Sequence, residues 1–301
     1  MSVTTIPVDE QEATDVEPRR APPSHPELAL TVITPPTGRA LVDVAELWRF
    51  RDLLYFLAWR DVKVRYKQTV LGAAWAVIQP AMMMVVFTIF FSRLAGASSG
   101  DAPYSLFVYA GLLPWTFFST AVAAAGNSVI GSERIITKVY FPRLSIPFAA
   151  VAASVVDFVV ALGLLAGLMA WHGCPPGPFL WVAPLVFGVI VLAALGIGTF
   201  LSALNVSYRD FRYVIPFLLQ IWMFATPTVY MQASGPPRAG WLGVALALNP
   251  LTGLIGAFRS SVLGGPMPWG ALAGASVCSV TLFVVGCLYF RRAEDKFADI
   301  I

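Results

Sequence analysis

The sequence predicts an all-α integral membrane protein with six transmembrane helices. Of its 301 residues, 57% are hydrophobic and only 12% are charged, about half the charged share of an ordinary soluble domain. The charges gather in a few short stretches and leave long uncharged runs between them. This composition excludes an ordinary cytosolic protein. A net charge of +3 is also too small and too dispersed to indicate a nucleic-acid-binding surface.

The first 45 residues differ from the rest of the chain. They are rich in proline, acidic and small residues and have no sustained apolar period, which is typical of a disordered segment. They also lack the basic start and continuous apolar run of a secretory signal. We therefore expect residues 1–45 to be a disordered cytoplasmic tail and residues 46–301 to form a six-span transmembrane domain.

Residues 47–67 show a partial helical stripe. Five charged residues share one side and five apolar residues share the other: Arg49, Asp52, Arg60, Lys63 and Lys67, against Leu47, Phe50, Leu54, Leu57 and Ala58. Arg51, Phe56, Asp61 and Arg65 do not follow this pattern. The stripe predicts a helix lying in the cytoplasmic interface before the first span. The alternative is a solvated basic flank.

Uncharged runs locate the spans. A charge at the bilayer centre costs about 2.5 to 3.5 kcal/mol on insertion scales, and a helix needs about 20 apolar residues to cross. A turn sequence from His172 to Pro178 divides the longest apolar stretch into two helices. The predicted spans are residues 70–92, 105–127, 147–171, 179–204, 213–231 and 269–290.

Residues 239–258 are uncharged but do not read as a full span. Asn249–Pro250 and several glycines interrupt them, and Arg259 follows at once. Two short re-entrant helices on the outer side, between spans 5 and 6, fit this pattern better. The alternative is a seventh span, which would place the C-terminus on the other side of the membrane.

Basic residues set the orientation of the spans. Fourteen Lys and Arg flank the side that carries the two ends, whereas three, Arg93, Arg238 and Arg259, flank the opposite side. Cytoplasmic loops carry the excess of Lys and Arg. Both termini of this multi-pass protein are therefore expected in the cytoplasm.

No enzymatic site emerges from the residues. His25 and His172 lie in Pro-rich surroundings without a Ser or Cys to activate, and the sequence contains no phosphate-binding GxxxxGK[ST] loop. The three cysteines are scattered, so neither a disulfide framework nor a metal site is indicated. The protein is expected to be no enzyme, and energy for any pumping must come from another polypeptide or a gradient.

Asp157 is the one clear ionisable residue inside a predicted span. It either lines a path or joins helices, or it lies near the cytoplasmic headgroups, paired with an internal donor. A single acid is a weak basis for ion coupling, although an ion-coupled secondary carrier remains the alternative from a different functional class.

Two predicted cytoplasmic loops carry mixed charged and aromatic residues. The first contains Glu133, Arg134, Lys138, Tyr140 and Arg143, and the second contains Tyr208, Arg209, Asp210 and Arg212. Such loops could bind a soluble partner, or they could be ordinary positively charged connectors.

Several motifs in the same order resemble the membrane subunit of type 2 ABC transporters that export polysaccharides and teichoic acids. The likeness runs from about residue 47 to the end. The motifs are Leu71–Trp75 with Gln79–Pro80, Gly111–Trp115, Lys138–Arg143, Tyr208–Asp210 with Gln220 and Pro227, Asn249–Pro250 before Phe258–Arg259, and Phe297–Ile301.

The resemblance implies a permease of the bacterial inner membrane that moves a lipid-linked polymer of O-antigen, capsule, galactan or teichoic-acid type. It implies a homodimer beside two copies of a soluble ABC ATPase subunit, which would bind ATP and Mg. The loop around Glu133, Arg134, Lys138, Tyr140 and Arg143, with Arg209 and Asp210, would couple to that ATPase. The alternative within the superfamily is an exporter of drugs or small lipids.

Aromatic side chains are candidates for the path of a sugar polymer, because their faces bind CH-rich sugar surfaces with little directional cost. The first span offers Trp75, Phe87, Phe90 and Phe91, and the fifth offers Phe217, Trp222, Phe224 and Tyr230. Asn249, Pro250 and Arg259 would form an outer gate. There Arg259 could meet the diphosphate linker of a lipid carrier or could anchor at lipid phosphate.

Overall fold

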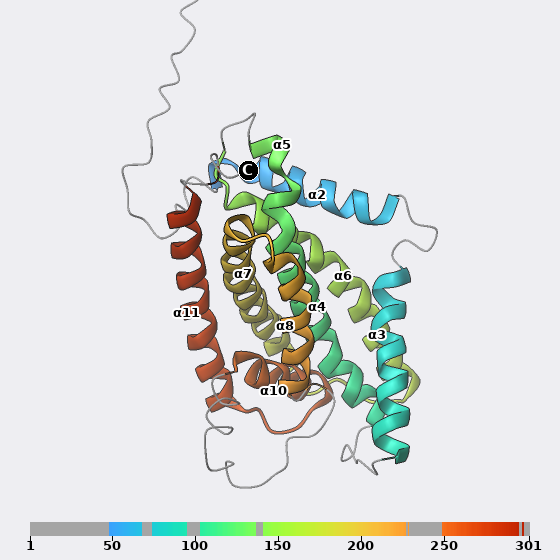
Figure 1. Ribbon diagram of the computed structural model, residues 1–301. Coiled ribbons are helices and arrows are strands. Elements are labelled where there is room, and N and C mark those ends of the chain that lie inside the picture. The colour runs from blue at the N-terminus through green and yellow to red at the C-terminus, as the bar shows by residue number, and fades with distance from the viewer. Residues whose placement is uncertain are drawn as a thin grey trace, which may run out of the picture. The chain divides into compact units, whose positions relative to one another are not determined.

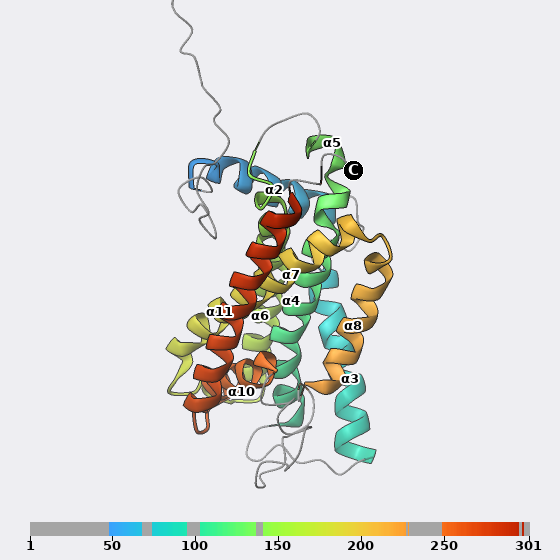
Figure 2. The same ribbon diagram turned by 60° about the vertical axis from the view of Figure 1, so that its left-hand side comes forward.

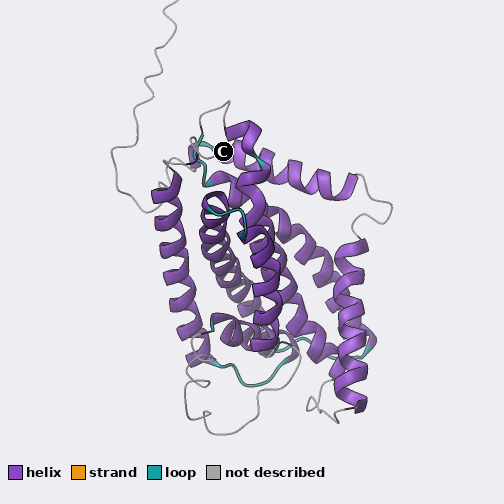
Figure 3. Ribbon diagram, in the orientation of Figure 1, coloured by secondary structure: helices purple, strands orange, loops and turns teal. Residues whose placement is uncertain are grey.

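The computed structural model describes residues 48–67, 74–94, 103–136, 141–226, 228, 249–294 and 297. Within these residues the protein is a bundle of helices without a strand (Figure 3). The predicted tail, residues 1–45, lies outside the described residues.

Five helices are long enough and apolar enough to cross a membrane. They are α3 (Ala74–Phe87), continued by the π-helical η1 (Thr88–Leu94), α4 (Tyr104–Gly131), α6 (Ser145–Trp171), α7 (Ala183–Ser207), preceded by the 3₁₀ turn η2 (Leu180–Val182), and α11 (Trp269–Glu294). They confirm five of the six predicted spans. The uncharged runs of the sequence therefore predicted the positions of the long helices correctly.

The remaining predicted span corresponds to a shorter helix, α8 (Phe211–Ala225). Its 15 residues extend about 22 Å at 1.5 Å per residue, less than the roughly 30 Å hydrocarbon core. The prediction that this helix reaches residue 231 was wrong. Thr226 is extended, with φ −109° and ψ 132°, because a residue before proline is disfavoured in the α region and Pro227 follows.

Helix α4 forms the centre of the bundle, where it packs against α6, α7, α8 and α10 (Figures 1 and 2). In the most apolar window of each helix, 78% of the residues are buried in α4 but only 6% in α3. Helix α3 therefore lies at the periphery of this single chain.

Helices α7 and α11 approach each other until their backbones touch. A Cβ atom added to Gly286 would overlap the carbonyl oxygen of Gly196, and one added to Gly196 would lie 2.5 Å from the backbone nitrogen of Phe283. Small residues allow such close approach of helices in membranes. The two glycines are therefore required by this packing.

One end of the bundle is crossed by α10 (Pro250–Leu263). Pro250 occupies the first helical turn, where its missing N–H is harmless. The predicted turn between α6 and α7 is confirmed and meets α10, since Gly177 N donates to the carbonyl oxygen of Val262 at 2.9 Å. Residues 239–248, which would hold the first of the two predicted re-entrant helices, lie outside the described residues.

The opposite end carries α2 (Arg51–Lys67), which lies across the bundle and packs on α6 (Figure 1). A helix in this segment was predicted. Its apolar stripe turns toward the protein, with Leu57 buried, whereas Tyr55, Phe56 and Trp59 are exposed. Helix α2 therefore has one protein-facing side and one aromatic outer side.

Candidate functional site

The predicted docking residues gather at the end of the bundle that carries α2 and the short helix α5 (Glu133–Ile136). Glu133 and Arg134 on α5 are exposed, as are Arg209 and Asp210 in the turn between α7 and α8. Both views place α5 and this turn at the same end (Figures 1 and 2). Lys138 and Tyr140 lie outside the described residues.

Arg143 has a different environment from the other docking candidates. It donates a hydrogen bond to the carbonyl oxygen of Glu294, and its Nε lies 4.0 Å from Oε1 of the same residue. Phe141, Phe290 and Phe297, which are close to these two residues in the sequence, belong to one buried apolar cluster. Arg143 thus joins the start of α6 to the end of α11.

Six of the eight predicted path aromatics fall into two groups. Trp75 on α3, Phe90 on η1, and Phe217 and Phe224 on α8 are all more than half exposed, from 54% to 64%. Phe87 and Phe91 instead lie against a small apolar cluster at the start of α4. Helices α3 and α8 each pack on α4 and leave an aromatic outer face uncovered. Tyr230 lies outside the described residues.

Trp222 belongs to a hydrogen-bonded junction between α8 and α10. Its Nε1 donates to Asn249 Oδ1 at 3.1 Å, and its ring lies edge-on to Phe118 at 5.3 Å. The same Asn249 oxygen caps α10 by accepting from Leu251 N at 3.1 Å, and Asn249 Nδ2 donates to Thr226 Oγ1 at 2.9 Å. Asn249 therefore connects the last turn of α8 to the first turn of α10.

Arg259 on α10 binds groups of its own chain. Its Nη2 donates to the carbonyl oxygen of Thr228 at 2.7 Å, and its guanidinium lies 3.7 Å from the ring centre of Phe107. This is the geometry of a cation–π contact. Gly111 leaves room for it, because a Cβ there would overlap both Nη2 and the Thr228 oxygen. The roles of Phe107 and Gly111 were not predicted.

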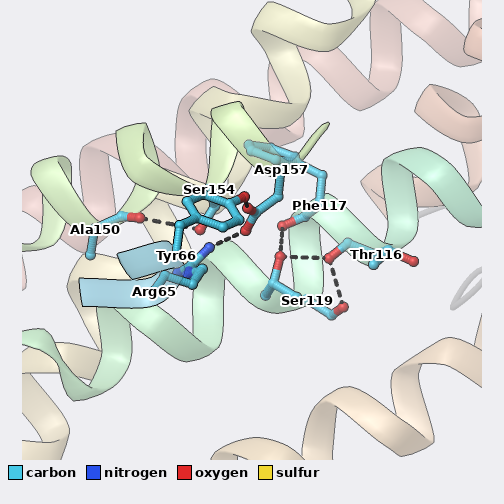
Figure 4. A network of polar contacts seen from close by, with 9 residues as sticks. Arg65, Tyr66, Thr116, Phe117, Ser119, Ala150, Ser154 and Asp157 are labelled. Atoms are coloured by element: carbon cyan, nitrogen blue, oxygen red, sulfur yellow. Dashed lines mark hydrogen bonds and ion pairs between the residues drawn. The ribbon is translucent and has the colours of Figure 1, made fainter. Parts of the chain in front are cut away.

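A polar network joins α2 to α6. Arg65 pairs with Asp157, and the Tyr66 hydroxyl donates a hydrogen bond to the other oxygen of that carboxylate (Figure 4). Burial, and then the hydrogen bond to Asp157, raise the pKa of Tyr66 above its ordinary value. The hydroxyl therefore stays protonated and remains a donor. Sequence reasoning missed this pairing, although it had singled out both Arg65 and Asp157.

Two cavities adjoin Arg65. One, of about 430 Å³, lies between α2, α3, α4 and α6 and has a mostly apolar wall. The other, of about 540 Å³, lies between α2, α4 and α6 and is lined by polar groups that include Asn127 and Ser128. The end of α2 therefore does not seal against the bundle.

Comparison with known proteins identifies the family of this chain. Residues 52–263 match the family described as ABC-2 type transporter. The chain is 31% identical over 259 residues to an O-antigen export system permease protein RfbA of Myxococcus xanthus, covering 86% of this chain and 98% of that protein. A protein of the same description from Klebsiella pneumoniae is 26% identical over 251 residues, covering 83% and 95%.

A more distant relative is the polysialic acid transport protein KpsM of Escherichia coli, which is 22% identical over 243 residues. That alignment covers 78% of this chain and 91% of KpsM. The family match spans most of the helical bundle, from α2 to the end of α10. Together with the apolar helices, it shows that this chain is a membrane permease of the ABC-2 type transporter family.

Proposed function

We propose that this chain is the membrane subunit of an ATP-driven exporter that moves a lipid-linked polysaccharide across the bacterial inner membrane. The substrate would be a polymer of the O-antigen, capsule, galactan or teichoic-acid type. Relatives named for O-antigen export and polysialic acid transport support this class of substrate. Both termini and the α5 end would face the cytoplasm.

The observation that carries the proposal is the pair of uncovered aromatic faces on α3 and α8. A single copy leaves Trp75, Phe90, Phe217 and Phe224 outside its own core. Two copies that pair through these helices would enclose a path with aromatic walls. Such walls can contact many sugar rings in turn without binding any single ring tightly.

The energy source in this proposal is a separate ABC ATPase in two copies, which holds ATP and Mg. Asp157 is the one acidic residue away from a helix end in the five long described helices, and Arg65 already neutralises it. This arrangement disfavours an ion-coupled carrier, which needs several ionisable groups within the membrane. The exposed Glu133, Arg134, Arg209 and Asp210 would contact the ATPase.

Depletion of the chain in its own host tests the proposal. We expect lipid-linked polysaccharide to accumulate on the cytoplasmic side, and affinity purification of the tagged chain to recover a soluble ABC ATPase. A strain in which the ATPase carries an inactive nucleotide site should accumulate the same polymer. Normal polymer at the cell surface after depletion would overturn the substrate assignment. Recovery without any ATPase would overturn the ABC mechanism.

A further inference from the structure

The cavity of about 430 Å³ beneath the end of α2 has an amphipathic wall. Its apolar lining includes Leu113, Phe117, Phe158 and Ala161. Arg65, Tyr66 and Asp157 form a charged corner, and Gln79, Thr116 and Thr120 add further polar groups to the wall. Figure 4 shows Arg65 and Tyr66 of α2 reaching across to Asp157 of α6. The cavity therefore offers one apolar compartment and one charged corner to the same ligand.

Because the wall is mostly apolar, most of the cavity is a poor site for water, which needs two to four polar partners when it is buried. Between membrane helices, the abundant apolar material is the hydrocarbon chain of a lipid. The cavity volume of about 430 Å³ far exceeds the roughly 30 Å³ that a water molecule occupies, so the site is larger than one for a single water. The volume and the mostly apolar lining of the cavity thus favour a lipid chain.

The charged corner indicates the headgroup. The Arg65 and Asp157 side chains are 37% and 20% exposed, so a ligand in the cavity can reach the pair. A guanidinium presents a planar fork of donors that fits a phosphate as well as a carboxylate. The corner is therefore complementary to an anionic phosphate.

We propose that this cavity binds a phosphate-bearing membrane lipid, with its chain in the apolar compartment and its phosphate on Arg65 in competition with Asp157. When Arg65 turns to the phosphate, Asp157 keeps the hydrogen bond from Tyr66. The carboxylate is therefore not left without a donor during the exchange. This inference holds whether or not the exported substrate is a polysaccharide.

Competition between the lipid phosphate and Asp157 for Arg65 makes a prediction that differs from that of a purely structural Arg65–Asp157 pair. If Arg65 and Asp157 only fastened α2 to α6, neutralising either one would loosen the same contact, and both variants would change lipid binding in the same direction. If the phosphate competes with Asp157, neutralising Arg65 removes the binding group, whereas neutralising Asp157 removes the competitor. The two variants then change lipid affinity in opposite directions.

The experiment measures lipid binding to the purified full-length chain by native mass spectrometry from detergent, at several lipid concentrations. The probes are phosphatidylglycerol, a long-chain isoprenyl phosphate, and diacylglycerol as the matched lipid without phosphate. We expect Arg65→Gln to weaken binding of both phosphate lipids at least tenfold, and Asp157→Asn to strengthen it severalfold. Lys63→Gln, which removes the same charge from the exposed side of α2, should change affinity less than twofold.

Two further variants distinguish a loss of lipid binding from a loss of protein structure. Arg65→Lys keeps the charge but lacks the planar fork, so it should fold and bind with an intermediate loss. Ala76→Phe, which fills the apolar compartment from α3, should weaken binding of all three lipids. Tighter binding of isoprenyl phosphate than of phosphatidylglycerol would identify a carrier lipid as the ligand, and equal binding would identify bulk phospholipid. Both outcomes support a phosphate-lipid site.

Three results would overturn the proposal. The first is a change in the same direction for Arg65→Gln and Asp157→Asn. The second is a loss for Lys63→Gln as large as that for Arg65→Gln. The third is binding of diacylglycerol as tight as that of the phosphate lipids.

Discussion

Gly111 lies directly against the guanidinium of Arg259, in a space that a single methyl group would fill. Any Cβ at this position would overlap both Nη2 of Arg259 and the carbonyl oxygen of Thr228 that Nη2 binds. The contact joins three segments: α4, α10 and the residues that follow α8. A residue without a side chain therefore permits the junction at the α10 end of the bundle.

We predict that Gly111→Ala destabilises the protein by about 1 to 3 kcal/mol, the usual cost of overpacking. The added methyl group must displace Arg259 or move the α4 backbone. Thermal unfolding of the purified chain in detergent measures the effect. Gly163→Ala is the matched control, since a Cβ on that α6 glycine meets nothing within 4 Å. Equal midpoints for the two variants would contradict the packing described here.

Asn249→Ala should cost about 1 kcal/mol for the lost helix cap alone, and more because Trp222 and Thr226 lose their partner. Asn249→Asp keeps the oxygen that caps α10 and accepts from Trp222, but it loses the donor to Thr226. It should therefore recover most of the stability. Thermal unfolding and polymer export are the measurements. Similar losses in both variants would show that the capping oxygen is not what matters.

Charge reversal at the α5 end should distinguish docking from folding. Arg134→Glu combined with Lys138→Glu should reduce the amount of copurified ATPase at least tenfold. Because Arg134 is exposed, the unfolding midpoint should change less than it does with Arg143→Glu. Arg143→Glu should instead destabilise the fold, since it places a negative charge beside Glu294. It should lower the midpoint and the amount of protein in the membrane. Full ATPase recovery with the first variant would exclude α5 as the docking site.

A native cysteine allows a direct test of topology. Cys174 lies in the turn between α6 and α7, at the end of the bundle that carries α10. With Cys278 and Cys287 replaced by alanine, Cys174 should react with a membrane-impermeant maleimide added outside intact spheroplasts. Cysteines introduced at positions 210 and 296 should react only after the membrane is opened. External labelling of position 296 would exclude the six-span arrangement with both ends inside.

The long helices were predictable because a charge in hydrocarbon is costly, so the spacing of charges marks where helices cross. Five spans follow from that rule, and their ends agree within a few residues. The end of helix α8 does not follow from the rule, because it depends on the local backbone restriction that Pro227 imposes on Thr226. A rule based on charge alone cannot detect that restriction.

The contacts of the site were less predictable, because they join residues that are distant in sequence. Arg65 departed from the charged stripe of its helix, and Asp157 was an acid inside a span that needed a donor. Arg65 therefore supplies the donor that Asp157 needs. Pairing these two residues in the sequence analysis would have predicted that α2 packs on α6. The contact of Arg259 with Phe107 gave no such signal, because nothing in the sequence distinguishes this phenylalanine from its neighbours.

The backbone contact between Gly196 and Gly286 restricts how a transport cycle can proceed. Where two helices touch backbone to backbone, no side-chain rotation can absorb a relative movement, so α7 and α11 must travel as one rigid body. Asn205 extends this body to α4 by donating to the carbonyl oxygen of Gly126 at 2.9 Å. The displacement that opens a passage must then fall on helices outside this body, such as α3 and α8, which pack on α4, and α2, which packs on α6.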